Sequence, residues 1–258
     1  MRYSLFAGGK RLRPILCLAA AEACGGKIDN ALPLACAMEC IHTYSLVHDD
    51  LPSMDNDDLR RGRPTCHKVF GDGIAVLAGD ALLTIAFEIV SRARPTRRYG
   101  MSMLLREVAV AAGSHKLIAG QVADLEAEGK SAGRAELLYI HENKTAAILT
   151  TSVRLGAMSA NASAKQLAAI TKFGRALGLA FQVIDDILDV TQTSDKLGKS
   201  AGKDIAAKKA TYPAVIGLER SRAEAKRLTR KAHEALSIYG KKAETMHELA
   251  NYLLERDY

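Results

Sequence analysis

The chain has 258 residues, of which 48% are hydrophobic and 25% charged, and its formal net charge is +7. This is enough for one sizeable domain, and the basic balance suits a polyanionic partner such as a phosphate-bearing molecule. Aromatic residues make up only 5% and tryptophan is absent, which disfavours a platform of stacked bases, so we expect no nucleic acid partner.

Apolar residues recur with helical spacing along the chain, and no alternating strand pattern or Asn-Gly turn appears. The pattern therefore predicts an all-α fold. Pro14 falls in the first turn of the first predicted helix, and Asp29 is the expected N-cap of the second. The predicted helices cover residues 10–24, 30–50, 73–92, 101–128, 135–159, 163–191, 221–238 and 242–256.

Two of these helices carry more specific expectations. Residues 73–92 are interrupted only by Asp80 and Glu88, which predicts a buried helix. Ser221 and Glu224 have the spacing of a capping box at the start of a later helix. The chain contains no run of 18 consecutive apolar residues, so we expect no membrane span.

The five cysteines are odd in number and form no CxxC pair, so neither a disulfide framework nor a zinc site is indicated. Cys36 and Cys40 have i,i+4 spacing, but no second pair of ligands lies nearby, and we predict that they are thiols of the core. This cysteine usage favours a reducing compartment and therefore a cytoplasmic location.

Residues 48–63, HDDLPSMDNDDLRRGR, bring many opposite charges together. They form either a solvated charged loop or a site for a ligand that is itself negative and metal-bound. The run contains Asp49, Asp50, Asp55, Asp57 and Asp58, followed by Arg60, Arg61 and Arg63.

A second acidic cluster, FQVIDDILD, lies in the longest predicted helix and contains Asp185, Asp186 and Asp189. Asp185 and Asp189 are four residues apart, so they share one helix face about 6 Å apart along the axis. Carboxylates among apolar neighbours are costly unless they are paired or bind a cation. An exposed acidic stripe is the alternative, but little polarity surrounds them, and the spacing favours a cation site.

Two sets of carboxylates offer only oxygen ligands, which suits Mg²⁺ and not zinc. Mg²⁺ takes few carboxylates per ion and completes its shell with phosphate oxygens and water. The pattern therefore predicts a polyphosphate bridged by several Mg²⁺ ions. Basic residues that could bind such a phosphate are Arg60, Arg61, Lys10, Arg13, Lys144, Lys199 and Lys209.

With these clusters in view, the sequence resembles the trans-isoprenyl diphosphate synthases, in particular the bacterial farnesyl diphosphate synthases. The matching stretches occur in the family's order over nearly the whole chain. They are GGKRLRP (8–14), ECIHTYSLVHDDLPSMDNDDLRRGRPTCH (39–67), LAGDALL (77–83), AGQVADLEAEGK (119–130), HENKT (141–145), GLAFQVIDDILDV (178–190), LGK (197–199) and KATYP (209–213).

The resemblance implies roles for individual residues. The Mg²⁺ ligands would be Asp49, Asp50, Asp55, Asp185, Asp186 and Asp189, with three ions per active site and Mn²⁺ as a substitute. The allylic diphosphate would contact Arg60, Lys144, Lys199 and Lys209. Isopentenyl diphosphate would bind Lys10, Arg13, His42 and Arg61. Thr145 and Gln182 would line the reacting centre. Outside this context, His42 would more simply be a buried core histidine.

The implied reaction is a head-to-tail condensation of isopentenyl diphosphate with dimethylallyl or geranyl diphosphate. Tyr44 and Ser45 lie about one helical turn before Asp49. A bulky aromatic side chain there acts in the family as a floor that stops chain growth, so Tyr44 favours farnesyl diphosphate as the product. Geranylgeranyl diphosphate is the alternative.

The resemblance also implies one antiparallel helix bundle around a central cavity, a homodimer, and a single polyprenyl synthetase domain over residues 1–258. Family members place one or two helices before GGKRLRP, so we expect the chain to lack these N-terminal helices. A class I terpene cyclase and a non-catalytic partner subunit are the rival interpretations, and the intact second aspartate motif, DDILD, argues against both.

Overall fold

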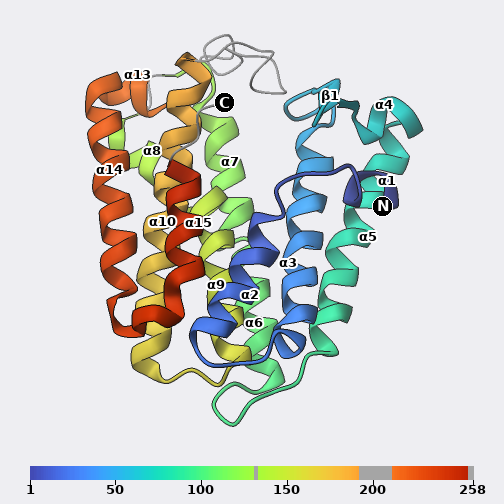
Figure 1. Cartoon of the computed structure of the whole chain (residues 1–258). Helices are drawn as coiled ribbons and strands as arrows, with labels where there is room; N and C mark the ends of the chain where they lie inside the picture. The colour runs from blue at the N-terminus through green and yellow to red at the C-terminus, as the bar shows by residue number, and fades with distance from the viewer. Residues whose placement is uncertain (131–132, 192–210, 255–258) are drawn as a thin grey trace.

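The computed structural model describes residues 1–130, 133–191 and 211–254. Within these ranges the chain forms a bundle of helices that run mainly up and down beside one another, as Figure 1 shows. The α-helices are α1 Arg2–Leu5, α2 Leu12–Ala23, α3 Ile28–Asp49, α4 Cys66–Phe70, α5 Asp72–Ser91, α6 Met101–Ala112, α7 Leu117–Ala127, α8 Arg134–Ile140, α9 Ala147–Ser159, α10 Ala164–Thr191, α13 Tyr212–Ile216, α14 Leu218–Ala235 and α15 Glu244–Leu254. The predicted all-α class is confirmed.

Three shorter elements complete the described chain. A π-helix, η1, covers His141–Ala146, and a 3₁₀ helix, η2, covers Ser237–Ala243. The strands β1 (Leu59–Arg60) and β2 (Arg63–Pro64) form a two-residue antiparallel hairpin. Arg61 and Gly62 both have positive φ, 56° and 73°, which is the backbone of a type I′ hairpin turn. The sequence analysis did not predict this hairpin.

Helix α9 lies at the centre of the bundle, in contact with α2, α3, α6 and α10. Glycines permit the closest approaches around it. A Cβ atom at Gly156 of α9 would collide with the carbonyl oxygen of Cys17 in α2. A Cβ atom at Gly120 of α7 would collide with the backbone of Lys144 in η1. The first contact fixes α9 against α2 at backbone distance, and the second fixes α7 against η1.

Several predicted boundaries need correction. Residues 101–128 form two helices, α6 and α7, which separate at Gly113. The predicted helix over 135–159 is interrupted by the π-helical turn at 141–146. Asp29 is not an N-cap, because α3 already begins at Ile28 and Asp29 lies in its first turn.

The predicted capping box at Ser221 is also wrong. Ser221 is fully buried inside α14, and its hydroxyl donates to the carbonyl oxygen of Gly217. A capping box does occur before α10, where the backbone N–H of Ser163 donates to Gln166 Oε1 at 2.9 Å. The N–H of Gln166 donates in return to Ser163 Oγ at 3.3 Å. This reciprocal pair closes the N-terminus of the longest helix.

The helix α5 is not buried as predicted. Only 28% of its most apolar 18-residue window is buried, and Ile74 and Leu77 are 56% and 63% exposed. By length and hydropathy alone, α5 and α10 are each apolar enough to cross a membrane. That is weak evidence for a span, because α10 passes the same test while packing inside the bundle. The exposed apolar surface of α5 nevertheless needs an explanation.

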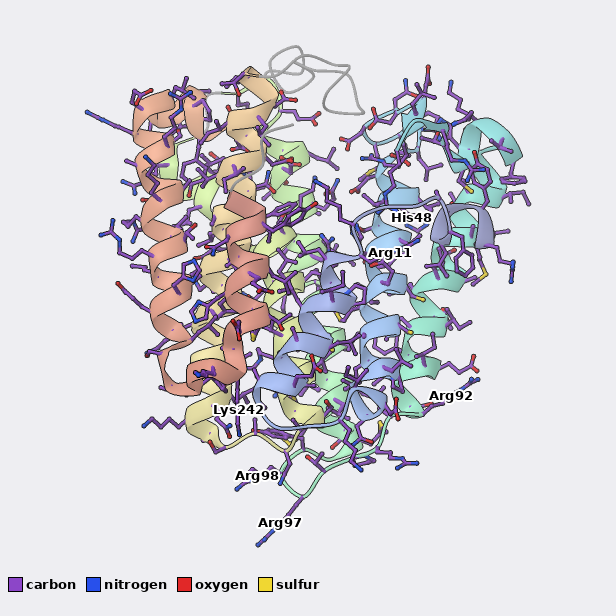
Figure 2. The ribbon with its side chains drawn as sticks, viewed as in Figure 1. Arg11, His48, Arg92, Arg97, Arg98 and Lys242 are labelled. Carbon is purple, nitrogen blue, oxygen red and sulfur yellow. The ribbon has the colours of Figure 1, made fainter. Side chains whose placement is uncertain are left out.

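All five cysteines are free. Cys17, Cys40 and Cys66 are buried, as expected for core thiols, whereas Cys36 is exposed on α3 and its predicted core position is wrong. Figure 2 shows Arg97 and Arg98 at the end of the bundle opposite Arg11. Arg98 donates there to the carbonyl oxygen of Asn161 at 2.9 Å, so these loop arginines lie far from the aspartate clusters.

Candidate functional site

The first aspartate cluster sits where α3 ends. Asp49 is the last residue of α3, Asp50 is its C-cap, and the chain then turns back on itself. The N–H of Asp55 donates to the carbonyl oxygen of Asp49 at 2.8 Å, and the N–H of Asp57 to that of Asp50 at 3.1 Å. This turn holds the carboxylates of Asp49 and Asp55 near one another at the helix end.

Asp50 is bound within the protein. Its side chain is 3% exposed, and Oδ1 accepts hydrogen bonds from Nε of Arg60, at 2.9 Å, and from Nη2 of the same residue. Arg60 also lies 3.1 Å from Asp57 Oδ2. Asp50 therefore orients Arg60, which was predicted to contact the allylic diphosphate. Asp58 pairs instead with Lys68 at the surface, so part of the charge run is solvated.

Asp49 carries an unbalanced negative charge. The pKa of Asp49 is raised to about 6, chiefly by burial and also by the neighbouring carboxylate of Asp55, while the ammonium of Lys144 acts to lower it. A carboxylate that lacks sufficient positive charge nearby is suited to binding a cation.

The second cluster lies near the end of α10. Asp185 is partly exposed, whereas Asp186 and Asp189 are each 3% exposed. Asp186 accepts from Gln182 Nε2 at 3.0 Å and from the backbone N–H of Tyr212 at 2.9 Å. Figure 1 places the ends of α3 and α10 at the same end of the bundle. The two clusters therefore lie at the same end of the bundle.

Thr145 and Gln182, which the resemblance assigns to the reacting centre, are in direct contact. The hydroxyl of Thr145 donates to Gln182 Oε1 at 2.9 Å, and Gln182 donates onward to Asp186. This network fixes the side-chain amide of Gln182 in one orientation. It continues through Asp186 to the N-terminus of α13, so one aspartate of the second cluster acts as a structural hydrogen-bond acceptor.

Lys144 lies on the π-helix η1. Its Nζ is 2.6 Å from Oδ2 of Asp124 on α7. Both side chains are largely buried, with exposed fractions of 22% and 18%. Single turns of π-helix are frequent at functional sites, since the extra residue changes where side chains point. Here the π-turn and the close approach of Gly120 place Lys144 beside Asp124.

The residues predicted to bind isopentenyl diphosphate gather around the start of α2. Burial lowers the pKa of His42 well below its usual value, and the positive charges of Arg13 and Arg61 lower it further, so the imidazole is neutral. Arg13 is half-buried, and the loss of solvent around its guanidinium lowers its pKa to about 10. Arg61 donates to the carbonyl oxygen of Gly8.

Lys10 lies beside α15. Its Nζ is 6.0 Å from the centre of the Tyr252 ring, at the outer limit of a cation–π contact. Lys10 is thus brought near the C-terminal helix as well as to the start of α2. Lys199 and Lys209, which were predicted to contact the allylic diphosphate, lie outside the described residues.

Tyr44 is 6% exposed, among the core residues between α3, α5 and α6. Its hydroxyl donates to the carbonyl oxygen of Ala112 at 3.4 Å, and its ring meets His48 edge-on with centroids 5.8 Å apart. Ser45 donates to the carbonyl oxygen of His42 at 2.9 Å. Tyr44 therefore forms a fixed wall below Asp49, whereas Ser45 is occupied by its own helix.

The donor set fits magnesium. No three His, Cys, Asp or Glu side chains within the described ranges form a ready-made metal cluster. All available donors are carboxylate oxygens, and Mg²⁺ takes only one or two of these with substrate phosphates and water. The raised pKa of Asp49 also indicates a carboxylate that a divalent cation would stabilise.

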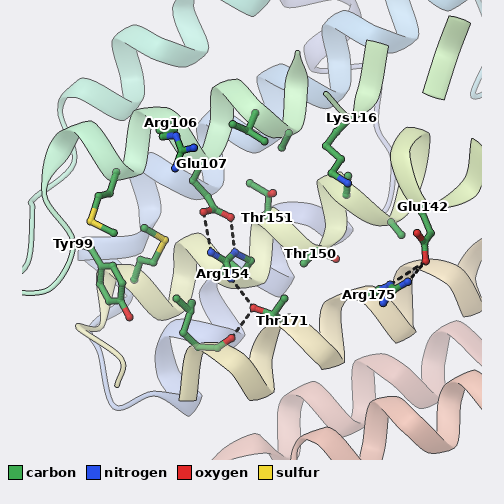
Figure 3. A pocket seen from close by; sticks show the side chains of 17 residues that line it. Tyr99, Arg106, Glu107, Lys116, Glu142, Thr150, Thr151, Arg154, Thr171 and Arg175 are labelled. Atoms are coloured by element: carbon green, nitrogen blue, oxygen red, sulfur yellow. Dashed lines mark hydrogen bonds and ion pairs between the residues drawn. The ribbon is translucent and has the colours of Figure 1, made fainter. Parts of the chain in front are cut away.

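A groove of about 450 Å³ lies away from the aspartate clusters, between α6, α9 and α10. Figure 3 shows its middle crossed by Arg154, which donates to both carboxylate oxygens of Glu107 and to Thr171. At one end Arg175 pairs with Glu142. The charges of Arg154 and Arg175 are thus paired across the groove, and Arg106 and Lys116 also line it.

Two polar residues of α7 were given no role in the sequence analysis. Asp124 holds Lys144, and Gln121 has a buried Nε2 without a hydrogen-bond partner among the described residues. Both lie in AGQVADLEAEGK, a stretch that contributed to the resemblance but from which no residue was assigned. The available signal was a polar pair spaced by three residues on an otherwise apolar helix.

Comparison with known proteins covers nearly the whole chain. Residues 1–253 match the polyprenyl synthetase family. The chain is 53% identical to a chloroplastic geranylgeranyl pyrophosphate synthase of Catharanthus roseus, over all of this chain and 73% of the relative. It is 51% identical to large subunit 1 of a chloroplastic heterodimeric geranylgeranyl pyrophosphate synthase of Arabidopsis thaliana, over 99% of this chain and 71% of that relative.

Solved structures show the same fold. A geranyltransferase from Helicobacter pylori, in complex with magnesium and isoprenyl diphosphate, superposes with a TM-score of 0.89 at 34% identity, covering 98% of this chain and 86% of that one. A geranylgeranyl pyrophosphate synthetase from Pyrococcus horikoshii superposes with a TM-score of 0.90 at 33% identity, covering 99% and 89%.

Proposed function

Because the chain belongs to the polyprenyl synthetase family, we propose that it condenses isopentenyl diphosphate with an allylic diphosphate to form geranylgeranyl diphosphate. One observation in the structure carries the proposal. The carboxylate-rich end of α3 lies at the same end of the bundle as the end of α10. The adjoining end of α10 supplies a second set of carboxylates, which is an arrangement suited to a metal-bound diphosphate.

We assign magnesium to Asp49, Asp55 and Asp185, whose side chains are partly exposed. Asp189 lies one turn after Asp185 on the same helix face and extends this set. Asp50 is assigned to orienting Arg60 and Asp186 to orienting Gln182. Magnesium, when bound, supplies positive charge that stabilises the departing pyrophosphate.

The chain's own residues bind and orient the substrates. Arg60 and Lys144 stabilise the negative charge that builds on pyrophosphate as the allylic C–O bond breaks and its electron pair departs. The double bond of isopentenyl diphosphate forms the new carbon–carbon bond, and the released pyrophosphate takes the proton lost from that unit. Thr145 and Gln182 present hydroxyl and amide oxygens beside the reacting carbons. The reaction needs no nucleophilic side chain.

Two observations on the length of the product point in different directions. The synthases named above from Catharanthus, Arabidopsis and Pyrococcus are geranylgeranyl enzymes, which supports a C20 product. Tyr44, buried below Asp49, supports farnesyl diphosphate, the C15 product that the sequence analysis favoured. We give the relatives more weight, since they match the whole chain, and keep farnesyl diphosphate as the second candidate.

A product assay tests the proposal. The purified protein is incubated with Mg²⁺, isopentenyl diphosphate and dimethylallyl, geranyl or farnesyl diphosphate, and products are identified by mass spectrometry. We expect geranylgeranyl diphosphate from all three allylic substrates and no product after addition of EDTA. A product that stops at farnesyl diphosphate would favour the second candidate. The absence of any condensation product in the presence of Mg²⁺ would contradict the proposed function.

We also propose that the exposed apolar surface of α5 pairs with a second copy of the chain. Ile74 and Leu77 lie one turn apart on this helix, and exposed apolar patches of this kind mark protein interfaces. The heterodimeric relative from Arabidopsis raises the alternative of a different subunit. Purified alone, the chain should be a dimer by light scattering, and Leu77→Asp should yield monomer. A monomeric wild-type protein would favour the different subunit.

A cytoplasmic location remains a prediction. The five free cysteines are consistent with a reducing compartment. Imaging of a fluorescent fusion of the full chain in its own cells would test it, and accumulation in another compartment would contradict it.

A further inference from the structure

We propose that His48 is a positioning residue for product length, and that Gly79 of α5 provides the space in which His48 sits. The imidazole of His48, held against α5, keeps the ring of Tyr44 at the depth where it limits chain growth. This inference rests on the function proposed above and on the role of Tyr44 in it. The resemblance assigned product length to Tyr44 and Ser45 and gave no role to His48 or Gly79.

The ring of His48 lies in a notch on α5 that a glycine makes possible. A Cβ atom at Gly79 would collide with Nε2 and Cδ2 of His48. Gly79 is buried in the interior of α5, where glycine is a poorer helix former than alanine. The space for the imidazole accounts for a glycine at this position. Any larger residue would displace the ring.

Polar contacts hold the imidazole in this notch. Its Nε2 lies 2.9 Å from the carbonyl oxygen of Val76 and 3.8 Å from Oδ1 of Asp80. Because a carbonyl oxygen only accepts, Nε2 donates in the first contact. Val76, Gly79 and Asp80 are spaced by three and four residues, so one face of α5 surrounds the ring. Figure 2 shows His48 near the end of α3.

The same imidazole packs against Tyr44 on its own helix. The two residues are four apart on α3, and their rings meet edge-on at 80°, with centroids 5.8 Å apart. The hydroxyl of Tyr44 reaches the carbonyl oxygen of Ala112 at 3.4 Å. That is long for a hydrogen bond from a hydroxyl, so it confines the ring weakly. The contact with His48 is therefore a main restraint on where the ring of Tyr44 lies.

These contacts connect α5 to product length by steric steps. Gly79 admits His48, His48 restrains Tyr44, and Tyr44 is the wall that the growing chain meets. If the imidazole is removed or displaced, the ring of Tyr44 gains room to move. A growing chain then extends further before it is released, so a larger share of the product is longer than in the wild type.

The experiment compares Gly79→Ala, His48→Ala and Gly73→Ala in the full chain. Gly73 also lies on α5, but a Cβ atom there meets nothing within 4 Å, which makes it the matched control. Mass spectrometry gives the ratio of longer products to the main wild-type product. Gly79→Ala and His48→Ala should each raise this ratio on the order of fivefold, as expected for loss of one ring contact. Gly73→Ala should leave it unchanged.

A double variant tests whether Gly79 acts through His48. In the His48→Ala background, a methyl group at position 79 has no ring to displace. Adding Gly79→Ala should therefore change the product ratio no further, because the two substitutions remove the same contact. Effects that multiply in the double variant would show that Gly79 acts by another route and would overturn the proposal.

Two further results would also overturn it. One is an unchanged product ratio in His48→Ala, and the other is a shift in Gly73→Ala as large as in Gly79→Ala. Thermal unfolding by circular dichroism shows which variants fold. If Gly79→Ala does not fold, His48→Ala alone decides, since it removes atoms and introduces no collision.

A readout without catalysis separates this inference from the proposed function. In protein with carbon-13-labelled tyrosine rings, the resonance of Tyr44 is identified by its loss in Tyr44→Phe. It should shift in Gly79→Ala and His48→Ala but not in Gly73→Ala. Such shifts in a protein that forms no prenyl product would mean that the proposed function fails while His48 still positions Tyr44. An unmoved resonance in the first two variants would contradict the inference whatever the activity.

Discussion

The ammonium of Lys144 lies 2.6 Å from a carboxylate oxygen of Asp124, so the cation assigned to the allylic diphosphate is ion-paired in the protein itself. Asp124 fixes the position of Lys144 from α7, and Gly120 on the same helix allows the two backbones to approach. This pair links a residue that the sequence analysis identified to one that it missed.

Replacing Asp124 with Asn should slow catalysis. The ammonium of Lys144 would lose its fixed position, and misplacement of a catalytic charge costs roughly 10²-fold in rate. We expect kcat to fall by about that factor in steady-state assays. Glu142→Gln is the matched control, because Glu142 also lies on η1 but pairs with the exposed Arg175. An unchanged kcat in Asp124→Asn would show that Lys144 needs no such support.

Replacing each of two adjacent aspartates on α10 should affect a different property of the protein. Asp185→Ala removes a partly exposed carboxylate, so activity should fall on the order of 10²- to 10³-fold with little loss of stability. Asp186→Ala leaves Gln182 and the N–H of Tyr212 without their acceptor, which costs about 1–3 kcal/mol each when buried. Urea unfolding should therefore show a clear loss of stability for Asp186→Ala and not for Asp185→Ala. Equal stability of the two variants would contradict the separate roles.

Product length should depend on the ring of Tyr44 and not on its hydroxyl. Tyr44→Met removes the fixed wall below Asp49 and should shift the products towards longer chains by one or more isoprene units. Tyr44→Phe loses only the 3.4 Å hydrogen bond to Ala112 and should leave product length unchanged. Mass spectrometry of both reaction mixtures measures the chain length of the products. Identical products from Tyr44→Met and the wild type would place the floor elsewhere.

The free energy of unfolding should fall in mild acid because of a pair of histidines where α14 contacts α15. His233 and His247 stack with ring centroids 4.9 Å apart, and their Nδ1 atoms are 2.6 Å apart. Burial and the charge of His233 lower the pKa of His247. A histidine in the unfolded chain has a pKa of about 6.5, so below that pH the unfolded chain binds more protons than the folded chain. The contribution of neutral His247 to the free energy of unfolding is therefore lost as the pH falls below about 6.5.

The measurement compares urea midpoints at pH 8 and pH 5.5 for the wild type and His247→Gln. The variant cannot take up the proton, so the difference between its two midpoints should be smaller than in the wild type. An equal difference in both proteins would show that other groups account for the acid sensitivity.

The sequence predicted a helix well where apolar periodicity and a proline in the first turn agree. Helix α2, with Pro14 in its first turn, lies within the expected range. The break at Gly113 was missed because apolar residues continue on both sides of it. The exposure of α5 could not be predicted, since periodicity reports that a face is apolar and not whether the same chain or another one covers it.

The candidate site was also predicted only in part. The carboxylates were visible because charge inside an apolar helix is costly, whereas the hydrogen bond between Thr145 and Gln182 was not predicted. Asp124 was not found, since it is a single acid whose meaning depends on a cation brought to it by the fold. Pair interactions between distant segments leave little trace in one sequence.

Glycines at the contacts between helices also set a limit on how such a protein can change. At Gly156 and Gly120 two backbones touch, so any larger residue forces the helices apart, and no single compensating substitution can restore the contact. Directed evolution should therefore leave these positions untouched. Variants with new product lengths should arise instead on surfaces where side chains meet side chains, as Tyr44 and His48 do. The innermost helix is the least adaptable part of the enzyme.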